Sequence, residues 1–275
     1  MSTRIACLGM LALLSGCTTL GPMPAITGQS VVPTPRPGVE AQVAGVPGYY
    51  LSDSVKSEGK GTTVAQAAVM AEPGELIGLP GLSVGGRFVG DDENGGYPEP
   101  MLRYRRGLDD RGVFSAGVLA HGGYGHGSAS GASYEATSGG LEAAVDARVT
   151  PESQWLEVHF TGSLGLSGLD ANGDYCLDAN GRWGVDCDEL STNRTHAKAS
   201  GFYPSVAGAI ALDIARHLHG VMHGGRVALH GAVGRMPRVE SAEQKDDKTY
   251  TAVGLSLTLG LGAVESEPKA KEPSR

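Results

Sequence analysis

Residues 253–261 read Val-Gly-Leu-Ser-Leu-Thr-Leu-Gly-Leu, so every second residue is apolar and the residues between are Gly, Ser or Thr. Successive side chains of a β-strand point to opposite faces, and this alternation predicts a strand with one apolar face. Seven segments upstream alternate in a similar way. The eight predicted strands are 82–90, 100–107, 112–122, 139–150, 154–168, 200–215, 225–236 and 249–263. Residues 82–263 are therefore predicted to form an all-β domain.

The connections between these segments alternate between long and short in the middle of the chain. Residues 123–138 and 169–199 are long connections, whereas 151–153 is short. Transmembrane barrels combine an even number of strands with short periplasmic turns and long outer loops. The sequence thus indicates an eight-stranded antiparallel up-and-down transmembrane barrel, with both termini on the periplasmic side.

The residues of the polar face indicate which side of the sheet is inside. From 252 to 262 this face carries only Ala, Gly, Ser and Thr, which fit a narrow lumen. All seven lysines lie outside the predicted strands, whereas a soluble sheet normally carries lysine on its wet face. Nine charged side chains share the parity of the small residues, and we expect them to form a lumen ion-pair network because unpaired buried charge is costly. They are Arg87, Arg103, Arg105, Glu142, Asp146, Arg148, Glu157, Asp213 and Arg226.

Aromatic residues make up only 5% of the chain, although membrane barrels usually carry aromatic girdles. A soluble periplasmic barrel that carries an apolar ligand therefore remains an alternative. The net charge of −8 argues against a nucleic-acid partner, which normally meets a basic face.

The N-terminus has the features of an export signal. Arg4 precedes ten apolar or small residues, too few to span a membrane, and Leu14-Ser15-Gly16-Cys17 follows. This motif resembles the lipobox of bacterial lipoproteins. The resemblance implies that residues 1–16 are a signal peptide and that Cys17 carries lipid, including palmitate. It also implies a lipid-anchored protein of the outer membrane of a Gram-negative bacterium.

Two further regions flank the predicted barrel. Residues 17–81 are rich in Pro and Gly and are predicted to form a lipidated tether, with a short helix over 62–71. Residues 264–275 are expected to be a charged, disordered tail. With these flanks, the chain resembles small outer-membrane barrel proteins of the outer-membrane-protein-A type, a resemblance of architecture over 82–263.

Cys176 and Cys187 remain after the signal is removed and Cys17 is lipidated. An even pair of cysteines in an exported protein predicts a disulfide. Closing so short a loop stabilises the fold by about 3 kcal/mol in the chain-entropy model.

Three groups of residues have the composition of binding or catalytic sites. Asp170, Asn172, Asp174 and Asp178 have the oxygen-ligand spacing of a calcium loop, although Tyr175 and Gly181 depart from the EF-hand pattern; a solvated acidic loop is the alternative. His217, His219 and His223 lie in one short connection and have the residue type of zinc or copper ligands; a wet turn is the alternative. His126 and Ser128, with Glu135 or Glu142, have the residue types of a hydrolase triad, and lipid A deacylases on small barrels look similar.

The functional hypothesis is a non-enzymatic outer-membrane lipoprotein that contacts membrane lipid. Its loops 123–138 and 169–199 would bind a partner or serve envelope integrity. An outer-membrane lipid hydrolase is a second hypothesis and the soluble carrier a third. No resident cofactor is expected, with calcium as the one candidate.

Overall fold

The computed structural model describes residues 39–52, 62–73, 77–91, 95–129, 132–151, 156–176, 194–214, 222–235, 238–241, 245–246 and 249–261. Their strands are β1 (Val39–Ser52), β2 (Thr62–Ala71), β3 (Leu82–Asp91), β4 (Gly95–Gly107), β5 (Phe114–Ala129), β6 (Ala132–Arg148), β7 (Leu156–Cys176), β8 (Arg194–Ile214), β9 (Met222–Arg235), β10 (Arg238–Ser241), β11 (Lys245–Asp246) and β12 (Thr249–Leu261). Within this part of the chain, no helix is both long and apolar enough to cross a membrane.

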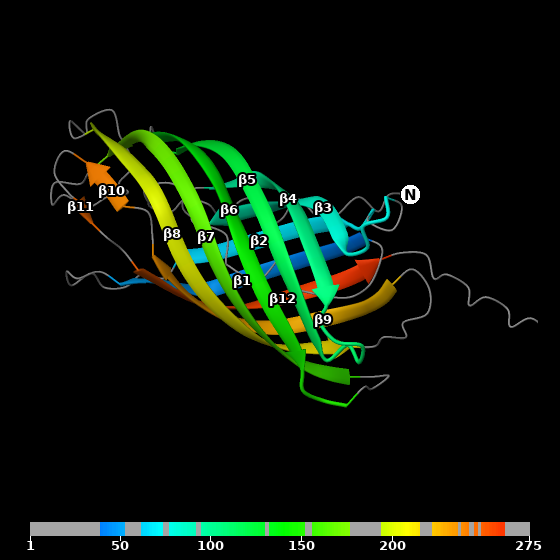
Figure 1. The fold of residues 1–275 in the computed structure, drawn as a ribbon. Helices are drawn as coiled ribbons and strands as arrows, with labels where there is room; N and C mark the ends of the chain where they lie inside the picture. The colour runs from blue at the N-terminus through cyan, green and yellow to red at the C-terminus, as the bar shows by residue number, and fades with distance from the viewer. Residues whose placement is uncertain are drawn as a thin grey trace, which may run out of the picture.

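Ten of the strands close into an antiparallel barrel (Figure 1). Each strand from β1 to β9 pairs with the next in the chain, and β12 completes the ring between β9 and β1. The short strands β10 and β11 extend the sheet where β10 pairs with residues 197–200 of β8. Closure gives every strand of the ring a partner on both sides, as a membrane span requires, although β4 and β5 pair only over residues 101–107 and 115–121.

The prediction of an all-β antiparallel barrel is confirmed, but the predicted number of eight strands is wrong. The two additional strands, β1 and β2, lie within residues 17–81, which we expected to be a tether. The helix expected over 62–71 is strand β2, paired on both sides. Alanine occurs on both faces of β2, so the apolar–polar alternation of this segment is weak in the sequence. Alanine is also a strong helix former, which favoured the helix prediction.

The long connection expected over 123–138 is also different. Strand β5 continues to Ala129 and β6 begins at Ala132, so these strands form a hairpin joined by residues 130–131. Strands β7 and β8 each have 21 residues, and their pairing continues to Cys176 and Arg194. At the end of the barrel where β5 and β7 finish and where β6 and β8 begin, the strands extend into segments that the sequence predicted to be loops.

Candidate functional site in the barrel lumen

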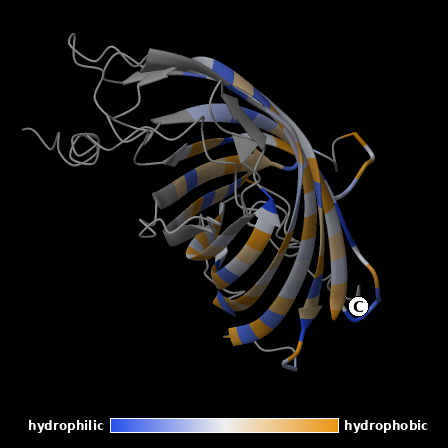
Figure 2. Cartoon of the chain, turned by 90° about the vertical axis from the view of Figure 1, so that its left-hand side faces the viewer, coloured by the Kyte–Doolittle hydropathy of each residue, from blue (hydrophilic) through white to orange (hydrophobic). Residues whose placement is uncertain are grey.

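The outer face of the barrel is apolar, whereas its inner face carries most of the polar and charged side chains, together with a smaller apolar cluster around Met70, Met101 and Leu119. In β12, Leu255 and Leu257 are 58% and 39% exposed, whereas Ser256 between them is 4% exposed. The same alternation runs around the ring, and Figure 2 shows it as bands of hydrophobic and hydrophilic residues along the strands. The exposed large residues include Val43, Val69, Phe88, Leu102, Val118, Leu141, Phe160, Leu164, Val206, Ile210, Leu229 and Val253. A continuous apolar exterior of this kind suits lipid rather than water.

Buried ion pairs cross the interior in three groups. The central cluster joins Arg87 of β3 to Glu99 of β4 and Glu142 of β6, with Nε–Oε2 and Nη1–Oε1 distances of 2.5 and 3.0 Å. His121 Nδ1 lies 3.2 Å from Glu99 Oε1, and the Ser138 hydroxyl donates to the same oxygen at 2.8 Å. The contacts from Arg87 to Glu142 and from Ser138 to Glu99 link strands that are not neighbours in the sheet, so this cluster crosses the lumen.

A second group, the β1–β4 cluster, lies toward the end of the barrel where β1 begins and β4 ends. Arg103 Nη2 and Arg105 Nη1 bind the two oxygens of Glu40 at 2.6 and 2.5 Å. Arg105 also pairs with Glu72, and Arg103 donates to the Ser83 hydroxyl at 3.3 Å. The carboxylate of Glu40 in β1 thus binds two guanidinium groups of β4, although β2 and β3 lie between these strands in the sheet.

The third group, the β6–β9 cluster, lies toward the same end. Arg226 of β9 binds Asp213 of β8 at 2.6 Å and Asp146 of β6 at 3.1 Å. Asp146 also accepts from Thr161 at 2.6 Å and lies 2.6 Å from His159 Nδ1. Arg148 Nη1 lies 3.2 Å from Glu157 Oε1.

All nine charged residues that the sequence placed in the lumen lie on the inner face and form ion pairs there. The sequence reasoning missed Glu40, Glu72 and Glu99. Glu99 shares the parity of Arg103 and lies one residue before the predicted strand, so extending that strand would have found it. Glu40 and Glu72 lie in the region assigned to the tether. Among the described side chains, the inner face therefore pairs five arginines with seven carboxylates.

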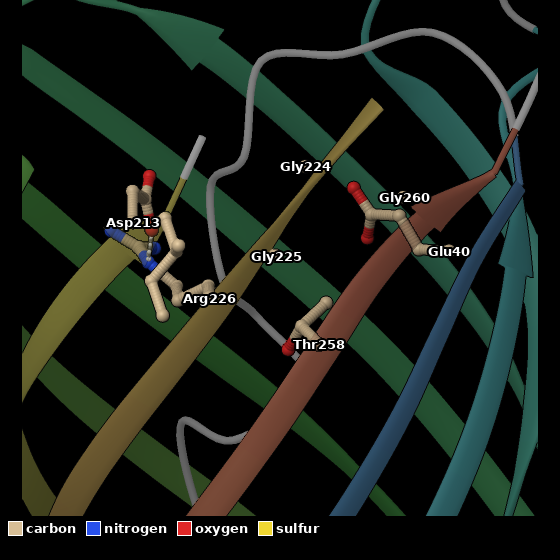
Figure 3. Close-up of a pocket in the computed structure, with 8 residues that line it drawn as sticks. Glu40, Asp213, Gly224, Gly225, Arg226, Thr258 and Gly260 are labelled. Carbon is tan, nitrogen blue, oxygen red and sulfur yellow. Dashed lines mark hydrogen bonds and ion pairs between the residues drawn. The ribbon is translucent and has the colours of Figure 1, made fainter. Parts of the chain in front are cut away.

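A pocket opens beside the β6–β9 cluster (Figure 3). Glu40, Asp213, Arg226 and Thr258 line it, together with Ile214, Gly224, Gly225 and Gly260. The ends of β8 and β12 and the starts of β1 and β9 meet here. The pocket thus opens toward the lumen charges at the end of the barrel where β1 and β9 begin and where β8 and β12 end.

The hydrolase set expected from the sequence is divided between the two faces of the barrel, and the side chain of Ser128, two residues from His126 in β5, lies outside the described part of the structure. His126 and Glu135 are cross-strand neighbours but are exposed on the outer face, whereas Glu142 binds Arg87 in the lumen. Another serine does meet a histidine. Ser167 Oγ lies 3.4 Å from His121 Nε2, and His121 Nδ1 lies 3.2 Å from Glu99 Oε1. Gly140 makes this contact possible, because a Cβ there would lie 2.6 Å from His121 Nε2 and 2.7 Å from Ser167 Oγ.

The acidic residues considered for calcium lie mostly in a strand rather than a loop. Asp170 and Asn172 are exposed on the outer face of β7, and Lys198 Nζ lies 3.3 Å from Asp170 Oδ1. Asp174 is also in β7, and Asp178 lies outside the described residues. Alternate residues of a strand are about 6.6 Å apart, so the described part does not wrap these oxygens around one point.

Three further predictions depend on residues that the structure does not describe. Cys176 ends β7, but Cys187 lies outside the described residues, as does Cys17. The disulfide and the lipid anchor remain predictions. His217 and His219 are likewise outside the described residues, and His223 lies in β9.

No family model matches the chain, and no curated protein matches it. Among solved structures, the chain is similar to Neisserial surface protein A, with 10% identity, 81% of this chain and 96% of that chain covered, and a TM-score of 0.32. It is also similar to the outer membrane protease OmpT of Escherichia coli, with 10% identity, 84% and 98% coverage, and a TM-score of 0.42.

The closed ring, the apolar exterior and the ion-paired interior together define the class of this protein. It is a β-barrel of the outer-membrane type.

Proposed function

We propose that this protein is a lipid-anchored, non-enzymatic outer-membrane barrel that presents its projecting strands to a partner outside the cell. The lipid anchor rests on the Leu14–Cys17 motif. The observation that carries the binding role is the length of β5 to β8, which have 16, 17, 21 and 21 residues. A strand needs only about 9–11 residues to cross a bilayer.

The outer face of these strands changes from apolar to polar where the extra length begins. In β7, exposed Leu164 and Leu166 are followed on the same face by exposed Asp170 and Asn172. The seven residues from 170 to 176 add about 23 Å along the strand. The neighbouring exposed polar residues are His126, Glu135, Thr137, Lys198 and Ser200. We call this surface the polar extension.

The polar extension is a continuous sheet surface. Asn172 pairs with Glu135 on one side and Lys198 on the other, and Glu135 pairs with His126. Both signs of charge occur within it. Exposed Tyr124 lies beside it, with its ring centroid 6.5 Å from that of His126. Such a surface suits a polar protein or glycan partner. The ion pairs that fill the lumen support a closed barrel rather than a channel.

Epitope insertion tests the orientation on which this function depends. An epitope between residues 130 and 131, at the tip of the β5–β6 hairpin, is expected to bind antibody on intact cells. A matched epitope between residues 151 and 152, at the opposite end, is expected to bind only after the outer membrane is permeabilised. The reverse pattern would refute outward display.

Lipid anchoring has a separate test. Cys17→Ala is expected to abolish palmitate incorporation while the barrel still shifts its gel mobility on boiling. Palmitate incorporation that survives Cys17→Ala would contradict the anchor.

A lipid-directed acyl hydrolase is a second candidate, favoured by the line of contacts that runs from Ser167 to His121 and from His121 to Glu99. A serine nucleophile needs a base within hydrogen-bond reach and a third group that orients the base. Arg87 Nη2 is buried near this line, and no described group is hydrogen-bonded to it. A fluorophosphonate probe that labels the folded protein, and fails to label Ser167→Ala, would establish this candidate. Absence of labelling would support the non-enzymatic function.

The soluble carrier has no comparable support. Its ligand cavity would have to be apolar, whereas ion pairs cross the described interior and the buried apolar side chains around Met70, Met101 and Leu119 pack against one another as one cluster.

A further inference from the structure

Three potential metal-binding atoms converge in the β6–β9 cluster. His159 Nε2 lies 3.5 Å from Glu157 Oε2 and 3.5 Å from Asp213 Oδ2. One potential ligand atom from each of the three residues lies within 4.8 Å of the other two. Ligands of tetrahedral zinc, with bonds of 2.0–2.2 Å, are about 3.4 Å apart. The observed separations therefore need only a small adjustment to surround such an ion.

The imidazole is oriented for this role. His159 is 8% exposed, and its Nδ1 lies 2.6 Å from Asp146 Oδ2. A carboxylate on one ring nitrogen fixes the proton there and directs the other lone pair toward a metal, as in many histidine–metal sites. Nε2 is buried and forms no hydrogen bond with any described group. Nε2 faces two carboxylate oxygens, and a cation between these three atoms would bind all of them.

Each carboxylate is held through its other oxygen. Arg148 Nη1 binds Glu157 Oε1 at 3.2 Å, and Arg226 Nε binds Asp213 Oδ1 at 2.6 Å. Oε2 and Oδ2 are thereby directed toward His159. Such outer contacts orient metal ligands and raise affinity.

The charge of the lumen also favours a divalent cation. Five arginines against seven carboxylates leave two negative charges on the described inner face, with histidines neutral. One divalent ion would balance them. Excess negative charge in a narrow space attracts cations, because the surroundings screen it poorly.

The backbone places the ligands on rigid strands beside an opening. Glu157 and His159 occupy the same face of β7, and Glu157 pairs directly with Asp213 of β8. Ala211 lies opposite His159 and leaves room for the ring. Asp213 also lines the pocket in Figure 3, so an ion has a route from the end of the barrel.

We propose that Glu157, His159 and Asp213 form a binding site for a divalent transition metal of the zinc class, positioned by Asp146, Arg148 and Arg226. One imidazole and two carboxylates suit zinc better than calcium, which prefers six or more oxygens. Three protein ligands leave a fourth coordination position for water or another ligand. This site is independent of the surface role proposed above.

Metal binding to the folded, full mature protein in detergent tests the site. Equilibrium dialysis against Zn²⁺, followed by elemental analysis, is expected to give at least one tightly bound equivalent. His159→Gln and Asp213→Asn are each expected to weaken this equivalent by 100-fold or more, and Asp146→Asn by about 10–100-fold. His230→Gln is the matched control, since His230 is a buried lumen histidine that contacts Ser256 instead.

Folding is checked for every variant by gel mobility before and after boiling. If His159→Gln does not fold, Asp213→Asn decides the question together with the visible absorption of Co²⁺-loaded protein. The triple variant His217→Ala, His219→Ala, His223→Ala is expected to keep the tight equivalent. Its loss in that variant, its retention in both folded ligand variants, or the absence of tight Zn²⁺ binding by the unaltered protein would each overturn the proposal.

Discussion

Replacing Arg87 with Met should destabilise the barrel strongly, because it removes the positive charge of the central cluster while keeping most of the side-chain volume. Arg87 contacts Glu99 at 2.5 Å and Glu142 at 3.0 Å, and the three side chains are 0%, 1% and 2% exposed. Removing one partner of a buried ion pair costs about 3–5 kcal/mol, since the remaining charge is left uncompensated. Two carboxylates lose their shared guanidinium here, so we expect a loss of at least about 3 kcal/mol.

The assay is equilibrium unfolding by guanidinium in lipid vesicles, followed by the gel mobility of unboiled samples. Arg106→Met is the matched control, because Arg106 is exposed on the outer face near the end of β4. It should change the free energy of unfolding by less than about 0.5 kcal/mol. The triple variant Arg87→Met, Glu99→Gln, Glu142→Gln should recover most of the loss, because no buried charge is left unpaired. A loss for Arg87→Met no larger than that for Arg106→Met would refute the assignment of these ion pairs to a dry interior.

Three further predictions test other parts of the structure. Asp109 accepts hydrogen bonds from the amides of Phe114 and Val113, which lower the pKa of this half-buried carboxyl below its ordinary value of 3.8. This stabilisation is present above that pH and is lost as the pH falls, so Asp109→Asn should be less stable at pH 7 and should converge with the unaltered protein in acid unfolding series. Gly140→Ala should lower the free energy of unfolding by about 1–3 kcal/mol in chemical denaturation, because the added Cβ would overlap lumen atoms. Gly231→Ala should be close to neutral, because nothing lies within 4 Å of the added Cβ, and equal effects of the two substitutions would contradict the packing. Deleting residues 39–71 should abolish the heat-modifiable band, since it removes β1 and β2, whereas a folded product would support an eight-stranded barrel.

The sequence predicted which face of most strands lies inside, because parity survives even where strand ends are misjudged. The alternation of Leu255, Ser256 and Leu257 decides this in β12, and the nine inner charges follow the same rule. The pattern works because a strand with one lipid face and one polar face must alternate along its whole length.

The predicted number of strands was wrong because small residues differ little in hydrophobicity, so their alternation between the two faces is hard to detect. Ala65, Ala67 and Ala68 supply both faces of β2, so neither period nor hydrophobicity identified it. Likewise, the segment near His126 reads as a Gly and Ser loop but pairs as a strand, since a glycine-rich strand carries no pattern that the sequence reveals.

The grouping of the charges could not be predicted from one sequence. The bonds from Arg87 to Glu142 and from Arg226 to Asp146 join strands that are not neighbours in the sheet. Such contacts depend on the width of the lumen and on the position of each strand in the ring. Both follow from the number of strands, which the sequence misjudged.

The depth of two adjacent residues of β12 in the bilayer tests the central claim most directly. Leu257→Cys and Ser256→Cys, each in a Cys176→Ser, Cys187→Ser background, would carry the same small fluorophore in vesicles containing brominated lipid. Leu257 is on the apolar exterior and Ser256 is buried in the lumen, so strong quenching is expected at 257 and weak quenching at 256. Equal and negligible quenching at both positions would contradict a membrane-spanning barrel with its leucine face toward lipid.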